Sequence, residues 1–114
     1  MVAHVVLFTP KPTLTPAERT AFVLALETAL RDVPGIVRAS VGRRFLAGRP
    51  YDALAGTAYE YVAVLEFQSR DALVRYLDHP AHDDLARQFY SKAQAALALD
   101  FDIVDGTDTR KLVS

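Results

Sequence analysis

The first strand that the sequence predicts is apolar on both of its faces. Residues 2 to 9 form a β-branched and apolar run that Pro10 ends. Because successive side chains of a strand point to opposite faces, these residues divide into two apolar sets. One set is Val2, His4, Val6 and Phe8, and the other is Ala3, Val5 and Leu7.

The run from Tyr59 to Phe67 has a similar pattern, with Val62 and Val64 opposite a face of aromatic and aliphatic side chains. A sheet with two apolar faces has to be covered on both. A chain of 114 residues is long enough for one domain and supplies one layer of helices. We therefore expect a homodimer in which a second copy covers the other face, with a cavity between or behind the sheets.

The order of the predicted elements indicates the fold class. Thr15, Pro16 and Glu18 carry the signals of a helix start, and Pro34-Gly35 ends that helix. Strands are expected over 36–45, 59–67 and 97–104, with a loop over 46–57. A second helix begins at Ser69, is broken at Pro80 and continues to about Ala96. This order predicts an α+β, ferredoxin-like βαββαβ sandwich over residues 1–105 and a loosely held polar tail over 106–114.

Composition excludes several classes of function. With 13 Lys+Arg against 14 Asp+Glu, and no block of basic residues, the chain lacks the charge of a nucleic-acid binder. No run approaches the roughly 20 apolar residues of a membrane span. Cysteine is absent, which excludes disulfides and thiolate chemistry. The first residues lack the features of a signal peptide, so the expected location is the cytoplasm.

The segment His79-Pro80-Ala81-His82 is the most informative candidate for chemistry. Pro80 fixes a bend, which places His82 in the first turn of the following helix. The positive end of a helix dipole disfavours an imidazolium, and a neutral histidine can accept a proton near pH 7. The plainer interpretation is a histidine that caps or packs at the kink.

Other candidates are weighed against structural roles. Tyr76 lies six residues before His82 and could share a cavity wall with it, or could be a core aromatic. His4 could be a core histidine, and Tyr61, on the same face, a packing residue of the sheet. Two sets of charged residues are better explained as solvated side chains than as a metal site or an anion-binding rim; they are Asp100, Asp102, Asp105 and Asp108, and Arg43, Arg44 and Arg49.

Three segments together resemble the stress-responsive α/β-barrel (Dabb) family. They are His4-Val5-Val6-Leu7-Phe8, Phe67-Gln68-Ser69-Arg70-Asp71-Ala72-Leu73 and Tyr76-Leu77-Asp78-His79-Pro80-Ala81-His82, with the region of Asp100 as a further mark. The resemblance covers about residues 2–105. It implies a ferredoxin-like protomer and a homodimeric α/β barrel, in agreement with the two apolar faces of the sheet.

One branch of this family is similar to the plant olivetolic acid cyclase, a polyketide cyclase that uses no cofactor. The resemblance implies His82 as a base and Tyr76 as its partner in an intramolecular aldol closure, with His4, Tyr61 and His79 as substrate-binding residues. Tyr61 stands where the cyclase has a histidine, so the carbonyl or polyketide-like substrate is open. No cofactor or metal is expected. The alternatives are a non-catalytic, stress-responsive or ligand-binding dimer and, on the same barrel, a haem-degrading or quinone-forming monooxygenase.

Overall fold

The computed structural model describes residues 1–56 and 58–113. The predicted loop 46–57 and tail 106–114 each include one position, 57 and 114, that lies outside the described residues. The elements follow in the order β1 (Val2–Pro10), α1 (Pro16–Asp32), β2 (Ile36–Arg43), α2 (Pro50–Leu54), β3 (Tyr61–Phe67), α3 (Arg70–Leu77), α4 (Pro80–Lys92), β4 (Ala93–Asp102) and the 3-10 helix η1 (Gly106–Leu112).

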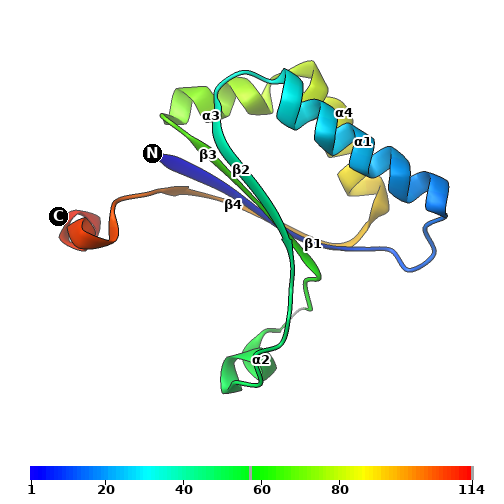
Figure 1. Cartoon of the computed structure of the whole chain (residues 1–114), viewed down its shortest axis with the longest axis horizontal. Coiled ribbons are helices and arrows are strands. Elements are labelled where there is room, and N and C mark those ends of the chain that lie inside the picture. The colour runs from blue at the N-terminus through cyan, green and yellow to red at the C-terminus, as the bar shows by residue number, and fades with distance from the viewer. Residues whose placement is uncertain (57, 114) are drawn as a thin grey trace.

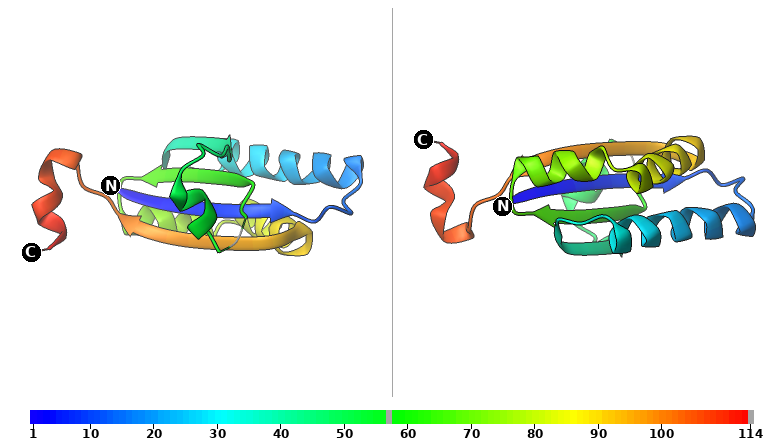
Figure 2. Two further views of the ribbon diagram at one scale, coloured as in Figure 1. Left: turned by 90° about the horizontal axis from the view of Figure 1, so that it is seen from below. Right: turned by 90° about the horizontal axis from the view of Figure 1, so that it is seen from above.

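The four strands form one antiparallel sheet in the order β2-β3-β1-β4. Helices α1, α3 and α4 lie together on one face of this sheet (Figure 1). The α+β ferredoxin-like fold is therefore confirmed. Two short helices, α2 and η1, project away from this body (Figures 1 and 2). Across the described residues, no helix has the length and apolar character needed to cross a membrane.

The start of α1 follows the predicted capping box. The backbone N–H of Glu18 donates to the Thr15 hydroxyl over 3.1 Å, and the Thr15 N–H donates to the Glu18 carboxylate over 3.0 Å. These two bonds satisfy donors that a helix start leaves without partners. After α1 the chain turns at Gly35, whose φ of 97° favours glycine.

The core lies between the sheet and its helices. Phe67 and Ala29 are fully buried, and Leu65 is 2% exposed. The helices contribute Leu73 and Leu85 to the same cluster. Burial of this cluster fixes which face of β1 and β3 is inward, and that face includes His4.

Among the residues that the structure describes, no helix covers the opposite face of the sheet (Figure 1), as the alternation of apolar residues predicts. On β4, Leu97, Leu99 and Phe101 are 37%, 42% and 48% exposed. The adjacent strand β1 contributes Val5 and Leu7 to this face. We call these five residues the open face.

Several predicted bounds differ from the structure. The strands expected over 36–45, 59–67 and 97–104 are β2 (Ile36–Arg43), β3 (Tyr61–Phe67) and β4 (Ala93–Asp102). The helix expected to reach Ala96 ends at Lys92, because the alanines that follow pair with β1 as part of β4. Alanine favours a helix, and tertiary pairing overrides that preference here. A short helix, α2, lies inside the predicted loop. In the predicted tail, the Asp105 carboxylate accepts from the Thr107 N–H over 2.9 Å and caps η1.

Candidate functional site

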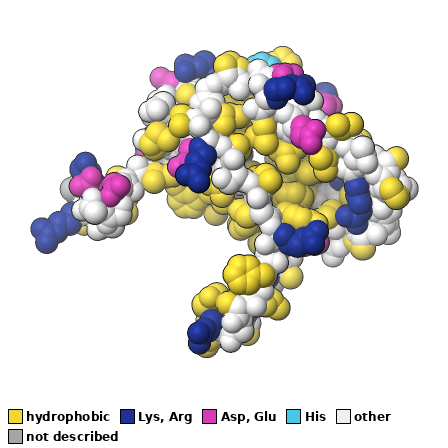
Figure 3. Space-filling model, in the orientation of Figure 1, with side chains coloured by type: hydrophobic (Ala, Val, Ile, Leu, Met, Phe, Trp, Pro, Cys, Tyr) yellow, Lys and Arg dark blue, Asp and Glu magenta, His cyan; other side chains and the backbone are white. Residues whose placement is uncertain are grey.

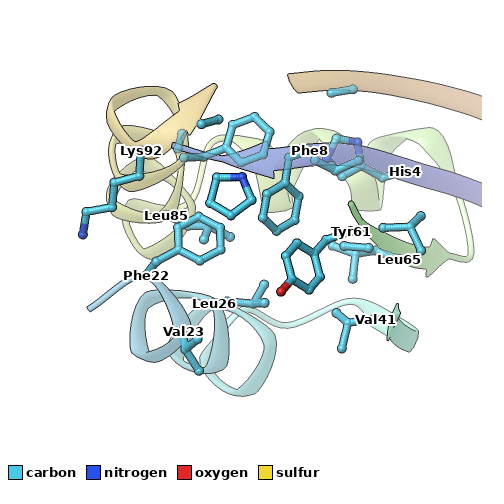
Figure 4. A pocket seen from close by; sticks show the side chains of 18 of the residues that line it. His4, Phe8, Phe22, Val23, Leu26, Val41, Tyr61, Leu65, Leu85 and Lys92 are labelled. Carbon is cyan, nitrogen blue, oxygen red and sulfur yellow. The ribbon is translucent and has the colours of Figure 1, made fainter. Parts of the chain in front are cut away.

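A cavity of about 730 Å³ lies between the helix-covered face of the sheet and helices α1 and α4. Most of its wall is apolar, and hydrophobic side chains gather around the hollow seen in Figure 3. Figure 4 shows Phe8 of β1, Phe22 and Leu26 of α1, and Leu85 of α4 around this space. The polar residues that line it are few, so their positions define what the cavity can do.

Tyr76 and His82 meet at this cavity. Helix α3 ends at Leu77 and α4 begins at Pro80, so the predicted break is confirmed. The bend brings the two rings to a centroid distance of 4.8 Å with an interplanar angle of 63°. Both residues line the cavity. The structure thus brings together the two residues proposed as a catalytic pair, which spacing alone leaves unresolved.

Burial shifts the pKa values of Tyr76 and His82 in opposite directions. Tyr76 is 1% exposed, and desolvation raises the pKa of its phenol to about 12. The pKa of His82 is lowered, first by burial and then by the nearby His4. The backbone of Leu77 and the carboxylate of Asp83 act in the other direction. At neutral pH, the Tyr76 hydroxyl is therefore protonated and able to donate a hydrogen bond, and the neutral form of His82 is favoured.

The Tyr76 hydroxyl has no hydrogen-bond partner within the described residues. No side-chain oxygen or nitrogen of those residues is both fully buried and without a partner, so the hydroxyl oxygen retains a small accessible area, although the residue as a whole is 1% exposed. The ring packs against Phe67, with centroids 5.3 Å apart, and against His4 at 6.1 Å.

His4 is held by a carboxylate from the neighbouring strand. His4 of β1 and Asp100 of β4 are direct cross-strand partners. The His4 Nδ1 and the Asp100 Oδ1 are 2.6 Å apart. A carboxylate at Nδ1 fixes the orientation of the imidazole and leaves Nε2 on the far side of the ring. His4 and Asp100 both line the cavity, next to Tyr76.

Asp100 is the site residue that sequence reasoning missed. Its alternation with Phe101 and its neighbouring aspartates favoured a solvated carboxylate. The signal that could have identified it is the pairing of β4 with β1, which sets Asp100 opposite His4. That pairing requires the topology, which spacing along the chain does not supply.

Tyr61 lies farther along the cavity. Its ring stacks on Phe8 at a centroid distance of 5.4 Å, and its hydroxyl accepts from Arg43 Nη2 over 3.2 Å. Since His4 pairs with Leu65, Tyr61 comes four residues before the level of His4 on β3, opposite Phe8. Tyr61 therefore lines the same space as the Tyr76–His82 pair without being next to it.

His79 is the N-cap residue of α4. Its Nδ1 accepts from the Ala81 N–H over 3.1 Å. It is not among the residues that line the cavity. A substrate-binding role for His79 stays a prediction, and the contact that the structure gives it is a helix cap.

Two of the other aspartates that were considered as metal ligands have local partners. Asp102 pairs with Arg70, and Asp108 lies 3.5 Å from Lys111. In the part of the chain that the structure describes, no group of three or more His, Cys, Asp or Glu side chains is arranged to hold a metal ion.

Comparison with known proteins gives the family and the fold. The model of the Dabb family, the stress responsive A/B barrel domain, matches residues 2–103. No functionally curated protein matches the sequence.

Three solved structures are similar over nearly the whole chain. A dimeric ferredoxin-like protein of unknown function from Thermobifida fusca is 22% identical, with 90% of both chains covered and a TM-score of 0.68. A hydroxynitrile lyase from Passiflora edulis is 14% identical, with coverage of 91% of this chain and 94% of that one and a TM-score of 0.74. SnoaB, a cofactor-independent oxygenase from Streptomyces nogalater, is 21% identical, with coverage of 94% and 96% and a TM-score of 0.64.

Proposed function

This chain belongs to the stress-responsive A/B barrel domain family, and we propose that its cavity takes an apolar carbonyl compound on which His82 and Tyr76 act without a cofactor. The observation that carries the proposal is the contact between these two rings, 4.8 Å apart, at one end of an apolar cavity. The reaction proposed is an intramolecular aldol closure of a linear, polyketide-like chain.

In the first step, neutral His82 removes a proton from the carbon next to a carbonyl group. The electron pair of that C–H bond forms an enolate, and the Tyr76 hydroxyl donates a hydrogen bond to its oxygen. A donor aimed at developing negative charge in a water-poor site stabilises the transition state. The lowered pKa of His82 and the raised pKa of Tyr76 keep both groups in the required protonation states at neutral pH.

In the second step, the enolate carbon attacks another carbonyl of the same molecule and forms the C–C bond. The alkoxide that results takes back a proton from His82, so the protein ends the cycle unchanged. The apolar wall favours folded conformations of the chain. Holding the two reacting carbons together can contribute much of the rate, with effective molarities of roughly 10⁵ M or more.

Two solved structures show that this fold can hold an enzyme. One is a hydroxynitrile lyase, and the other is an oxygenase that is described as cofactor-independent. The substrates of those proteins are not carried over to this chain, because the likeness is one of fold.

The test uses a linear diketone with an alkyl tail, whose aldol closure gives a cyclic β-hydroxy ketone that loses water to form a cyclic enone absorbing in the ultraviolet. We expect wild-type protein to accelerate closure and His82→Ala to lose about 10²–10⁴-fold of that acceleration, the usual contribution of a general base. Arg87→Gln is the matched control, because Arg87 is on the same helix as His82, is 77% exposed and does not line the cavity. Equal rates for His82→Ala and Arg87→Gln would contradict the proposal.

A second candidate function is ligand binding without turnover. The observation that favours it is the apolar character of most of the cavity wall, which can hold a hydrophobic molecule without chemistry. This candidate predicts that His82→Ala retains ligand affinity and that no variant changes the rate of any conversion.

We also propose that the open face packs against a second copy of the chain. The open face is apolar and has no cover within the described residues. The Thermobifida fusca protein with this fold is described as dimeric. A stable interface of standard size buries about 1,200–2,000 Å² in total.

A further inference from the structure

The cavity has a polar end and a cationic end. The polar end lies at the level of His4, where β1 pairs with Asp100. The other end lies near Pro10, where β1 pairs with Ala93. The two levels are six residues apart on β1, which is roughly 20 Å at about 3.3 Å per residue of strand. The wall between them includes Val6 and Phe8.

Three cationic side chains line the cationic end. Arg19 is on the first turns of α1, Arg43 is the last residue of β2, and Lys92 is the last residue of α4. Arg43 pairs with Tyr61, and Tyr61 pairs with Phe8, so Arg43 is on the side of the cavity away from His4. Basic side chains are seen at the edge of the apolar hollow in Figure 3.

Hydrogen bonds hold Lys92 at this end. Its Nζ donates to the Glu18 backbone carbonyl over 3.0 Å, and it also contacts the Gln88 side chain. These contacts join the end of α4 to the start of α1. Lys11 lies at the same place, since its N–H donates to the Lys92 carbonyl over 2.8 Å and its Nζ donates to Ser91.

The positive charge of this end is only partly balanced. Within residues 1–56 and 58–113, Arg19, Arg43 and Lys92 form no ion pair with a carboxylate. Two carboxylates are nearby: Glu18, which is committed to the Thr15 cap, and Glu60, which acts on Arg43 at longer range. The carboxylate that lines the cavity, Asp100, is at the other end and bonds to His4.

We propose that the ligand of this cavity carries an anionic group, which Arg19, Arg43 and Lys92 bind at the cationic end. The apolar chain of the ligand lies along Phe8, Phe22 and Phe89, and the reacting carbonyl reaches Tyr76 and His82. The placement of the carbonyl rests on the proposed function, whereas the anion site does not. The shared chemistry is a negatively charged oxygen group, either a carboxylate or a phosphate at the end of a carrier.

The experiment measures binding of three probes, each with a linear chain of eight carbon atoms, by isothermal titration calorimetry. The probes are octanoate, octyl phosphate and octanamide. We expect wild-type protein to bind at least one of the two anions about tenfold more tightly than the neutral amide, as one charge-assisted contact can provide. Preference for octanoate assigns a carboxylate, and preference for octyl phosphate assigns a phosphate.

Variants show whether the cationic end causes the preference. Arg19→Gln, Arg43→Gln and Lys92→Gln together should reduce it to less than twofold and leave the affinity for octanamide unchanged. Arg87→Gln is the matched control, because Arg87 is on α4, is 77% exposed and is not a lining residue. His82→Ala should retain the preference.

Three results overturn the inference. Equal affinity of wild type for all three probes excludes an anion site and leaves the proposed function intact. If His82→Ala abolishes the preference for the anions and the triple variant retains it, the anion binds at the polar end of the cavity and not at the cationic end. Failure of every probe to bind contradicts both the anion site and an open apolar cavity. Loss of enone formation alone affects only the proposed function.

Discussion

Replacing Tyr76 by phenylalanine should separate function from stability. The substitution removes one oxygen atom from a ring that is 1% exposed. The ring keeps its contacts with Phe67, His4 and His82, whose centroids are 5.3, 6.1 and 4.8 Å away. The change therefore tests the hydroxyl alone.

The effect on stability should be small. A hydroxyl that forms a hydrogen bond inside the protein contributes about 1 kcal/mol, and a buried partner left without it costs about 1–3 kcal/mol. Within the described residues, the Tyr76 hydroxyl has no such partner. We therefore expect Tyr76→Phe to change the free energy of unfolding by less than about 1 kcal/mol. Tyr76→Ala, which also removes the ring, should cost about 3–5 kcal/mol.

The effect on turnover should be large. If the hydroxyl donates to the enolate oxygen, its loss resembles the loss of one oxyanion-hole donor, which lowers the rate about 10²–10³-fold. Urea unfolding and the rate of enone formation are measured on the same preparations. A loss of stability above about 2 kcal/mol in Tyr76→Phe, or an unchanged rate, would refute the reasoning.

Three further predictions concern the groups around this site and the open face. Burial lowers the pKa of His82 in the folded protein, so the unfolded chain takes up a proton first as the pH falls below about 6.5. The stabilisation that neutral His82 contributes is therefore complete above that pH and is lost as the pH falls through the folded pKa. Urea midpoints measured from about pH 7.5 to about pH 5 should fall less in His82→Gln than in wild type, and an equal fall in both would contradict the prediction. Asp100→Asn removes the carboxylate from His4, whose side chain is 9% exposed, and should destabilise the fold by about 1 kcal/mol. Asp102→Asn should cost less, because its partner Arg70 is 78% exposed and remains solvated. The reverse order in thermal unfolding would be evidence against a structural pairing of Asp100 with His4. Leu99→Arg on the open face should convert a dimer to a monomer, as measured by sedimentation velocity. Val74→Arg, at a position 51% exposed on α3, should leave the dimer intact. A Leu99→Arg variant that remains a dimer would exclude the open face as the interface.

Local signals predicted the helix start and the helix break. The capping box at Thr15 needs only residues three apart, and its two hydrogen bonds are present. The break at Pro80 follows from the missing N–H and the fixed φ of proline. The fold class follows from these elements and from the alternation of apolar residues on β1 and β3.

Other features depend on the arrangement of elements in space. The end of α4 is set by pairing of the following alanines with β1, which competes successfully against their preference for a helix. The Asp100 contact with His4 joins residues 96 positions apart. The 4.8 Å contact of Tyr76 with His82 depends on the angle between α3 and α4, which a proline permits but does not specify. Sequence spacing could therefore nominate the pair but not place it.

The most direct test of the central claim is the rate at which the protein exchanges the α-protons of octan-2-one for deuterium in D₂O, followed by proton NMR. This measurement needs no knowledge of the natural substrate, since it reports only proton removal next to a carbonyl in the cavity. The account predicts exchange that is catalysed by wild type and by Arg87→Gln, and that falls about 10²-fold or more in His82→Ala. Equal exchange rates in wild type and His82→Ala would contradict the assignment of His82 as the base.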